Sequence, residues 1–318
     1  MEERKGLVDF HFHTNHSDGT ATVAGAVEEA KLRGVAAMAL TDHNTEAGVE
    51  EFLEICKEAG ITALEGVEIY AAFPETEWAW DIGKCGPVPD MTILGRKLNW
   101  KKFKEYKNNL NNYWVTKWLP ETLEKLKSLG FKVPFLARKE IQEQVNVGIP
   151  PVLHEVPKNP ENWPRLLKIC QSFNSEFSKE ELEKSPVAAT NRYVYSIQGG
   201  AYVLRGPQEF GVSEAIDLAT QMYGVLFAAH PGGNYGAWSI EHLNYFVRMG
   251  GGGIEVWQYY HKPDQIRLFL EYAIRYGLLV SGGSDWHGAN GRTTLGCWDK
   301  PENQTPVWVA QYLLDRLP

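Results

Sequence analysis

The sequence predicts an α/β fold of parallel strands that carries an inserted subdomain. Short apolar segments alternate with amphipathic segments over the first hundred residues, and the same alternation returns after residue 206. The stretch between these two parts has a different composition. With 318 residues and 43% hydrophobic content, the chain can bury a large core, either in one big domain or in one domain with an insertion.

The first hundred residues are predicted to form three strands separated by two helices. The strands are expected over residues 7–13, 35–44 and 61–72, and the helices over 22–34 and 46–60. Each helix ends in a glycine that suits a left-handed cap, and a new strand follows at once. This βαβ order indicates parallel strands.

The same order is predicted for the last part of the chain. Helices and strands alternate there, with helices over 213–224, 239–250 and 263–277 and strands over 225–233, 253–260 and 278–288. The composition shifts at both edges of the middle stretch, and the flanking pattern resumes unchanged. We therefore expect one domain built from residues 1–96 and 206–318, and a mainly helical subdomain inserted over 97–205.

Charge is unevenly distributed along the chain. The whole chain carries a formal net charge of -8, but residues 96–140 hold twelve Lys or Arg against four Glu, which makes that segment net +8. The overall negative charge argues against binding to duplex nucleic acid, which depends on neutralising phosphates with cations. The inserted subdomain is therefore expected to be basic within an acidic protein.

Other features of the composition predict a cytoplasmic protein. The four cysteines are far apart and form no C-x-x-C pair, so they are expected to be ordinary reduced thiols. The first residues lack the apolar stretch of a signal peptide. We also find no run of about 18 apolar residues that could span a membrane.

Histidines and carboxylates gather where the predicted strands end. Asp9, His11 and His13 alternate along the first strand and share a face, so the two histidines can bind one metal ion. The carboxyl ends of parallel strands are where α/β barrels and open sheets have their active sites. Further candidate ligands follow in order: Asp18, His43, Glu68, His230, Asp285 and His287. An isolated histidine pair is weak evidence, but this ordered set predicts a metal site.

The ordered motifs resemble those of the PHP (polymerase and histidinol phosphatase) superfamily. The closest form is its branch of metal-dependent phosphoesterases with an inserted subdomain. The matching phrases are "DFHFHTNHSDG", "ALTDHN", "GVEI", "AHPGGNY", "GIEVWQYYH" and "GSDWHG" followed by "GRTTLG". They cover both outer parts of the chain. The resemblance implies a distorted TIM-like (β/α)7 barrel that carries an inserted, mainly helical subdomain.

The resemblance also implies which side chains hold the metal ions. One ion would be bound by His11, His13, Glu68 and Asp285, and another by Asp18, His43 and His287. In some members a third ion is bridged by the same glutamate and bound by two further histidines. At the corresponding phrases, "H-I/V-L-G" and "R-P-H", this chain has Thr92 and Glu140, while His230 remains. Two divalent ions, Mn, Fe or Zn, are therefore expected, and a third site stays open.

Two further histidines are considered as ligands. His16 lies beside Asp18 in the same loop and is an alternative ligand, although Asp18 fits the register of the family better. His154 is expected to be a structural or surface residue.

Metal ions with nitrogen and oxygen ligands suit hydrolysis, because they activate water and neutralise charge on a phosphoryl group. Arg138, His261 and Arg292 are the candidates for binding the substrate phosphate. His230 or His261 is the candidate for protonating the leaving oxygen. For each, the alternative is a structural or solvated residue.

The leading prediction is a metal-dependent phosphoesterase that hydrolyses a small phosphorylated metabolite with metal-activated water. A nucleotide is one candidate substrate, because aromatic residues of the insertion could stack on a base or could simply form its core: Trp100, Tyr106, Tyr113, Trp114 and Trp118. One alternative is an amidohydrolase-type carbon–nitrogen hydrolase, which activity on a neutral amide would favour. Another is a degenerate, non-catalytic PHP module. The sequence predicts no oligomeric state.

Overall fold

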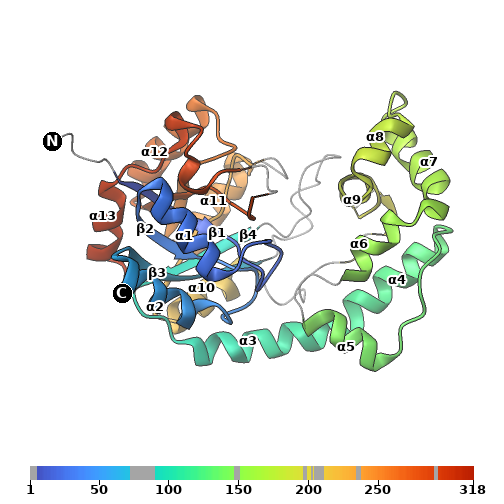
Figure 1. The fold of residues 1–318 in the computed structure, drawn as a ribbon, viewed down its shortest axis with the longest axis horizontal. Coiled ribbons are helices and arrows are strands. Elements are labelled where there is room, and N and C mark those ends of the chain that lie inside the picture. Colours follow the sequence, from blue (N-terminus) through green and yellow to red (C-terminus); the bar gives the residue numbers. More distant parts are fainter. Residues whose placement is uncertain are drawn as a thin grey trace. The chain divides into compact units, whose positions relative to one another are not determined.

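The computed structural model describes most of the chain as two compact units (Figure 1). The described residues are 6–71, 90–146, 151–195, 199–201, 203, 211–233, 238–289 and 293–318. The barrel unit contains the described parts of 1–71, 90–107 and 210–318, and the inserted unit contains those of 108–209. Within this described part, no helix has the length and apolar character needed to cross a lipid bilayer.

The barrel unit is built on one sheet whose seven strands follow the order of the chain. They are β1 (Leu7–Phe12), β2 (Val35–Leu40), β3 (Thr62–Tyr70), β4 (Asp90–Gly95), β5 (Val225–Ala228), β6 (Gly253–Gln258) and β7 (Leu279–Gly283). Phe12 and Trp286 form a parallel bridge next to β1 and β7, and the Asp285 N–H donates to the His11 carbonyl at 2.8 Å. The sheet is therefore a nearly closed barrel, which confirms the predicted TIM-like fold.

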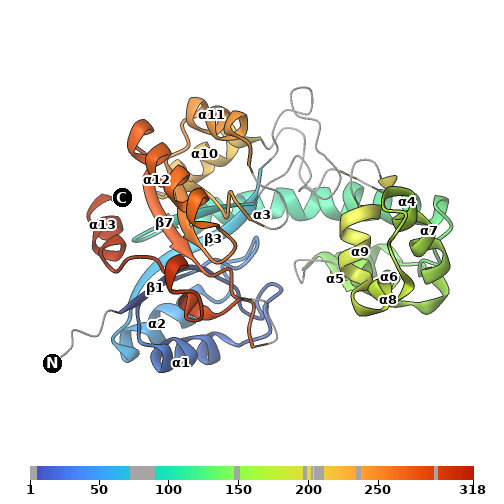
Figure 2. The same cartoon turned by 90° about the horizontal axis from the view of Figure 1, so that it is seen from above.

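Helices pack against the outside of this sheet (Figure 2). They are α1 (Val23–Arg33), α2 (Val49–Ala59), α10 (Val212–Gln221), α11 (Ile240–Met249), α12 (Pro263–Tyr276) and α13 (Trp308–Arg316). Gly34 and Gly60 end α1 and α2 in the left-handed conformation, and their N–H groups bond helix carbonyls, which confirms the expected glycine caps. Phe12 of β1 and Met38 and Leu40 of β2 form one buried hydrophobic cluster with side chains of α1 and α2, among them Val27 and Phe52.

Strand β4 departs from the parallel order. It runs antiparallel to both β3 and β5, whereas the other paired neighbours are parallel. Its first residue, Asp90, pairs with Tyr70, and Thr92 pairs with Glu68. The beginning of β4, rather than its end, therefore lies at the end of the barrel where the parallel strands finish.

The inserted unit is mainly helical, as predicted (Figure 2). After α3 (Trp100–Tyr113), its helices are α4 (Leu119–Ser128), α5 (Arg138–Asn146), α6 (Pro151–Lys158), α7 (Trp163–Phe173), α8 (Lys179–Lys184) and α9 (Pro186–Ala189). The first turns of α3 belong to the barrel unit, because Phe103 is fully buried and the Trp100 indole N–H donates to Glu65 at 2.7 Å. The inserted unit thus begins at residue 108, whereas the composition placed this boundary at 97.

Candidate metal centre

Four side chains from β1, β3 and β7 meet inside the barrel at the carboxyl ends of these strands. The Nε2 atoms of His11 and His13 both lie 3.2 Å from Glu68 Oε2. Asp285 follows β7, and its Oδ1 lies 3.2 Å from His13 Nε2 and 3.6 Å from His11 Nε2. His11, His13 and Glu68 are fully buried. The structure therefore brings together the first ligand set that the resemblance implies.

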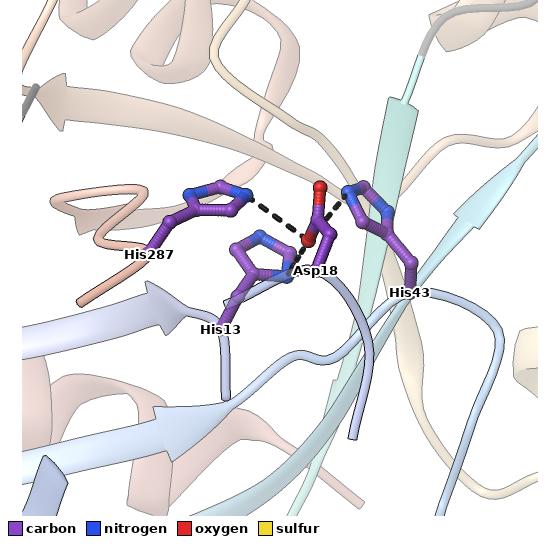
Figure 3. Close-up of side chains that lie close together, drawn as sticks. All are labelled: His13, Asp18, His43 and His287. Atoms are coloured by element: carbon purple, nitrogen blue, oxygen red, sulfur yellow. Dashed lines mark ion pairs between the residues drawn. The ribbon is translucent and has the colours of Figure 1, made fainter. Parts of the chain in front are cut away.

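A second group of side chains surrounds Asp18 (Figure 3). Asp18 Oδ1 lies 3.2 Å from His287 Nε2, and 3.9 Å from both His13 Nδ1 and His43 Nε2. These ligand atoms all lie within 4.8 Å of one another. His13 consequently faces both groups, because its Nε2 points to Glu68 while its Nδ1 points to Asp18.

The loop that carries Asp18 is held in place by a carboxylate that follows β2. Asp42 accepts hydrogen bonds from the Thr14 N–H and from the hydroxyls of Thr14 and Ser17. Gly19 lets the loop turn back closely, because a Cβ at this position would lie 2.6 Å from a backbone oxygen of the loop. The S-D-G phrase therefore forms a tight turn and also presents its aspartate to the histidines.

His230 reaches the first group from the end of β5. Its Nε2 lies 3.2 Å from Glu68 Oε1. His11 faces the other oxygen of the same carboxylate, Oε2. One ligand atom from each of His11, Glu68, His230 and Asp285 lies within 4.8 Å of the others. The structure thus adds His230 to this group.

Asp90 forms a third group with His43 and Glu68. Sequence reasoning missed Asp90, because its position depends on the reversed direction of β4. Thr92, which replaces a family histidine, is buried opposite Glu68, and its hydroxyl has no hydrogen-bond partner among the described residues. Glu140, at the other departure from the family, accepts a hydrogen bond from the Ala137 N–H at the start of α5.

Several ligand atoms are buried without a hydrogen-bond partner in the described part of the chain. They are His13 Nδ1, His43 Nδ1 and Glu68 Oε2. Buried polar atoms in folded proteins normally have a partner, so these atoms indicate that something else is bound among them. Imidazole nitrogens and carboxylate oxygens are common ligands of Zn, Mn and Fe. The residues present therefore fit divalent metal ions.

Charge pairing organises this cluster in the metal-free protein. Burial opposes the charge of His13, but the nearby carboxylates of Asp285 and Glu68 raise its pKa to about 10. Burial likewise opposes the charge of His230, while the hydrogen bond to Glu68 raises its pKa to about 9. Burial would raise the pKa of Glu68, yet the charges of His11 and His43 hold this pKa well below its usual value. Metal ions must displace protons here, so their affinity falls as the pH falls.

His261, a candidate for binding the phosphate or protonating the leaving oxygen, has both ring nitrogens bonded to the backbone. Its Nδ1 donates to the Val256 carbonyl at 2.9 Å, and its Nε2 accepts from the Gly232 N–H at 3.0 Å. Burial lowers the pKa of His261 to about 4. In this arrangement the ring holds the Gly232 backbone and is neutral near pH 7.

The other substrate-binding candidates lie in the inserted unit or outside the described residues. Arg138 is the exposed first residue of α5 in the inserted unit, and Arg292 falls outside the described residues. Trp114 and Trp118 are buried with their ring centres 5.0 Å apart, so they belong to the core rather than to a surface that stacks on bases.

The remaining histidine candidates take no part in the ligand groups of the described chain. His16 lies close to Gly48, because a Cβ on that glycine would be 2.7 Å from His16 Cδ2. His154 lies in α6 of the inserted unit.

Sequence reasoning also missed Glu255, on β6. Its Oε1 accepts a hydrogen bond from His11 Nδ1 at 2.7 Å, and its Oε2 accepts from the His230 N–H at 2.6 Å. The available signal was a carboxylate in the middle of a strand that is otherwise apolar up to Gln258.

Comparisons with known proteins agree with this site. The model of the PHP domain family matches residues 9–186. The 3′,5′-nucleoside bisphosphate phosphatase of Chromobacterium violaceum is 26% identical over 309 residues, which cover 95% of each chain. The phosphoribosyl 1,2-cyclic phosphate 1,2-diphosphodiesterase of Eggerthella lenta is 25% identical over 287 residues, which cover 90% of this chain and 96% of that relative.

A solved structure shares the whole fold. It is a candidate metal-dependent phosphoesterase from Bifidobacterium adolescentis, which is 25% identical to this chain with a TM-score of 0.64. The match covers 99% of this chain and 97% of the solved one. Fold, ligand cluster and relatives together define a metal-dependent phosphoesterase. The chain belongs to the PHP domain family, whose model matches more than half of its residues.

Proposed function

We propose that this enzyme hydrolyses phosphate esters of small metabolites at a centre of two divalent metal ions, with nucleoside phosphates as the first substrates to test. The observation that carries the proposal is the convergence of eight ligand side chains at one end of the barrel. The two relatives are named for a nucleoside bisphosphate and a phosphoribosyl cyclic phosphate, which supports a substrate of this size.

The two ligand groups suggest how the eight side chains are shared. We assign one ion to His11, Glu68, His230 and Asp285, and the other to His13, Asp18, His43 and His287. Divalent ions in these positions would activate water and neutralise negative charge on a phosphoryl oxygen. The third group, around Asp90, shares His43 and Glu68 with the first two, so the proposal keeps two ions.

Water is the proposed nucleophile, because the nearby serine is committed elsewhere. Ser284 precedes Asp285, but its hydroxyl donates to Asp9 Oδ2 at 2.6 Å in the interior of the barrel. His230 directs its Nε2 at Glu68, so we assign this ring to metal binding rather than to protonation of the leaving oxygen.

The state of the cysteines supports a reducing compartment. Cys56, Cys170 and Cys297 are buried free thiols. Because such thiols persist where disulfides are not formed, we propose the cytoplasm as the location of the enzyme.

Elemental analysis combined with a phosphate-release screen tests the proposed function. Wild-type protein is expected to hold two ions per chain and to release phosphate from nucleoside or sugar phosphates. Changing His11 and His13 together to Ala should remove stoichiometric metal and phosphate release, because both rings face Glu68. The matched control is His16→Ala, in the same loop region, which should keep both. An unchanged metal content in the double variant would remove the basis of the proposal.

A further inference from the structure

A second buried glutamate lies behind the metal centre. Glu255 on β6 is 1% exposed, and two of the proposed metal ligands, His11 and His230, occupy both of its oxygens. Glu68 lies on the other side of the same two rings, where its Oε2 and Oε1 are each 3.2 Å from one Nε2 atom. The two imidazole rings are stacked with their centres 5.4 Å apart. The His11 ring is thus held between two carboxylates, whereas Glu68 contacts the ring of His230 and Glu255 contacts its backbone.

The contact with Glu255 decides which nitrogen of His11 can bind a metal ion. A neutral imidazole carries one proton, and a carboxylate at 2.7 Å from Nδ1 keeps that proton on Nδ1. The lone pair is then left on Nε2, the atom that faces Glu68. A carboxylate behind a ligating histidine also makes the ring a stronger ligand.

The other oxygen of Glu255 holds the backbone of His230. This residue has a φ of 27°, in the left-handed region that residues other than glycine rarely adopt. The His230 N–H donates to Glu255 Oε2 at 2.6 Å, and this conformation aims the ring at Glu68. The same carboxylate therefore fixes a ring orientation on β1 and a strained backbone after β5.

We propose that Glu255 is the positioning residue of the metal centre, which sets the tautomer of His11 and the place of His230 without binding metal itself. This inference rests on the proposed function, because it requires a metal ion at His11. Glu255 is not one of the eight proposed ligands, but its loss is expected to weaken metal binding.

The variant Glu255→Gln tests this role with little change in shape. A glutamine has one acceptor and one donor end, so it cannot accept from both His11 and the His230 N–H. The dissociation constant for Zn²⁺, measured by chelator competition, is expected to rise by about 10- to 100-fold. A dissociation constant within about twofold of wild type would overturn the proposal.

The matched control is Glu65→Gln, the same change at another buried glutamate of the barrel unit. Glu65 accepts from the Leu98 N–H at 2.9 Å and from the Trp100 indole at 2.7 Å, outside the metal centre. This variant should lower the thermal stability of the metal-free protein but leave the Zn²⁺ dissociation constant within about twofold. An equal loss of zinc affinity in both variants would mean that Glu255 acts only on general stability, and would overturn its positioning role.

The route through His11 is tested in protein that already carries His11→Ala. There Glu255→Gln should weaken zinc binding several-fold less than in wild type, because the ring that Glu255 orients is gone. If Glu255→Gln raised the Zn²⁺ dissociation constant by the same factor in the His11→Ala protein as in wild type, the proposed route would be overturned. Wild-type protein that binds no zinc would refute the proposed function itself, which separates that failure from failure of this inference.

Discussion

Single histidines in the barrel unit differ in charge because different groups face their rings. His13 and His230 face carboxylates, which raise the pKa of each ring despite burial. His261 faces a backbone carbonyl and a backbone N–H instead, and burial lowers its pKa. The first two rings are therefore suited to exchange a proton for a metal ion, whereas His261 is suited to stay neutral and hold the Gly232 loop.

His261 makes the stability of the fold depend on pH. Burial lowers its pKa to about 4, whereas a histidine in the unfolded chain has a pKa of about 6.5. As the pH falls, the unfolded chain binds this proton first, so stability is complete above about pH 6.5 and is lost toward pH 4. The loss from this group is about 3 kcal/mol. Urea unfolding of metal-free His261→Gln should show a flatter profile over this range than wild type. Parallel profiles would assign the dependence to other groups.

For single residues, the sequence predicts the metal ligands better than it predicts the residues that hold those ligands in position. His11 and His13 are two positions apart on a strand, and this local spacing alone places both rings on one face. Glu255 is 244 positions from His11, and only the closed barrel brings them together. The neutral role of His261 likewise depends on a distant backbone group, the Gly232 N–H.

Among the elements, the seam between β1 and β7 closes the barrel and carries the first metal ligands. Asp9 on β1 accepts from the N–H and hydroxyl of Ser284 and from the Gly296 N–H. Burial raises the pKa of Asp9 to about 6, although these hydrogen bonds oppose the shift. Gly283 on β7 lies against the backbone of His11. A change at this seam therefore acts on stability and on the metal centre together.

Gly283→Ala should disturb both properties. An added Cβ would lie 2.4 Å from the His11 backbone nitrogen, so the two strands would have to move apart. We expect a loss of about 1–3 kcal/mol in unfolding free energy, measured in urea, and weaker zinc binding.

The control is Gly60→Ala, at the left-handed end of α2, where an added Cβ meets open space. This variant should lose roughly 1–2 kcal/mol of unfolding free energy, because alanine is unfavourable in the left-handed conformation. Its zinc binding should be unchanged. Wild-type stability and zinc affinity in Gly283→Ala would contradict the account of the seam.

The direction of β4 shows what sequence patterns omit at the scale of elements. The parallel strands could be predicted because a helix pattern lies between them. The segment 90–95 is a short apolar stretch beside the inserted residues, and such a stretch fits either direction. Asp90 could not be recognised as a possible ligand without that direction.

Across the whole molecule, charge is divided between acidic and basic parts. The segment 96–140 is net +8 in a chain of net -8, and it contains Arg138 at the exposed start of α5. A phosphate ester carries negative charge, so this basic segment would complement the substrate. We keep Arg138 as a proposed phosphate-binding residue on this ground.

Arg138→Ala should raise KM or lower kcat/KM for a phosphate ester without removing metal. The loss of a hydrogen bond to a charged group is about 1.5–3 kcal/mol, which is roughly tenfold or more in kcat/KM. The neighbouring Lys139→Ala serves as the control, because Lys139 is exposed and lies 3.8 Å from Glu143. Steady-state kinetics equal to wild type in Arg138→Ala would assign this residue to the surface.

Packing begins the inserted unit at a later residue than the charge pattern does. The basic character begins near residue 96, whereas the barrel unit extends to residue 107. Charged side chains on the exposed face of α3 dominate the composition, while Phe103 and Tyr106 on its other face are buried. A boundary drawn from charge therefore falls earlier than one drawn from packing.

The seam between the first and last strands also sets the order in which the site can assemble during protein synthesis. Asp9 leaves the ribosome 275 residues before Ser284 and 287 residues before Gly296. At 5–20 residues per second, this delay is roughly 15 to 55 seconds. During that time β1 can pack on α1, β2 and α2, but its other edge has no partner and its histidines lack Asp285 and His287. His11 and His13 are thus made long before Asp285 and His287, and they acquire their complete surroundings only after β7 has been made.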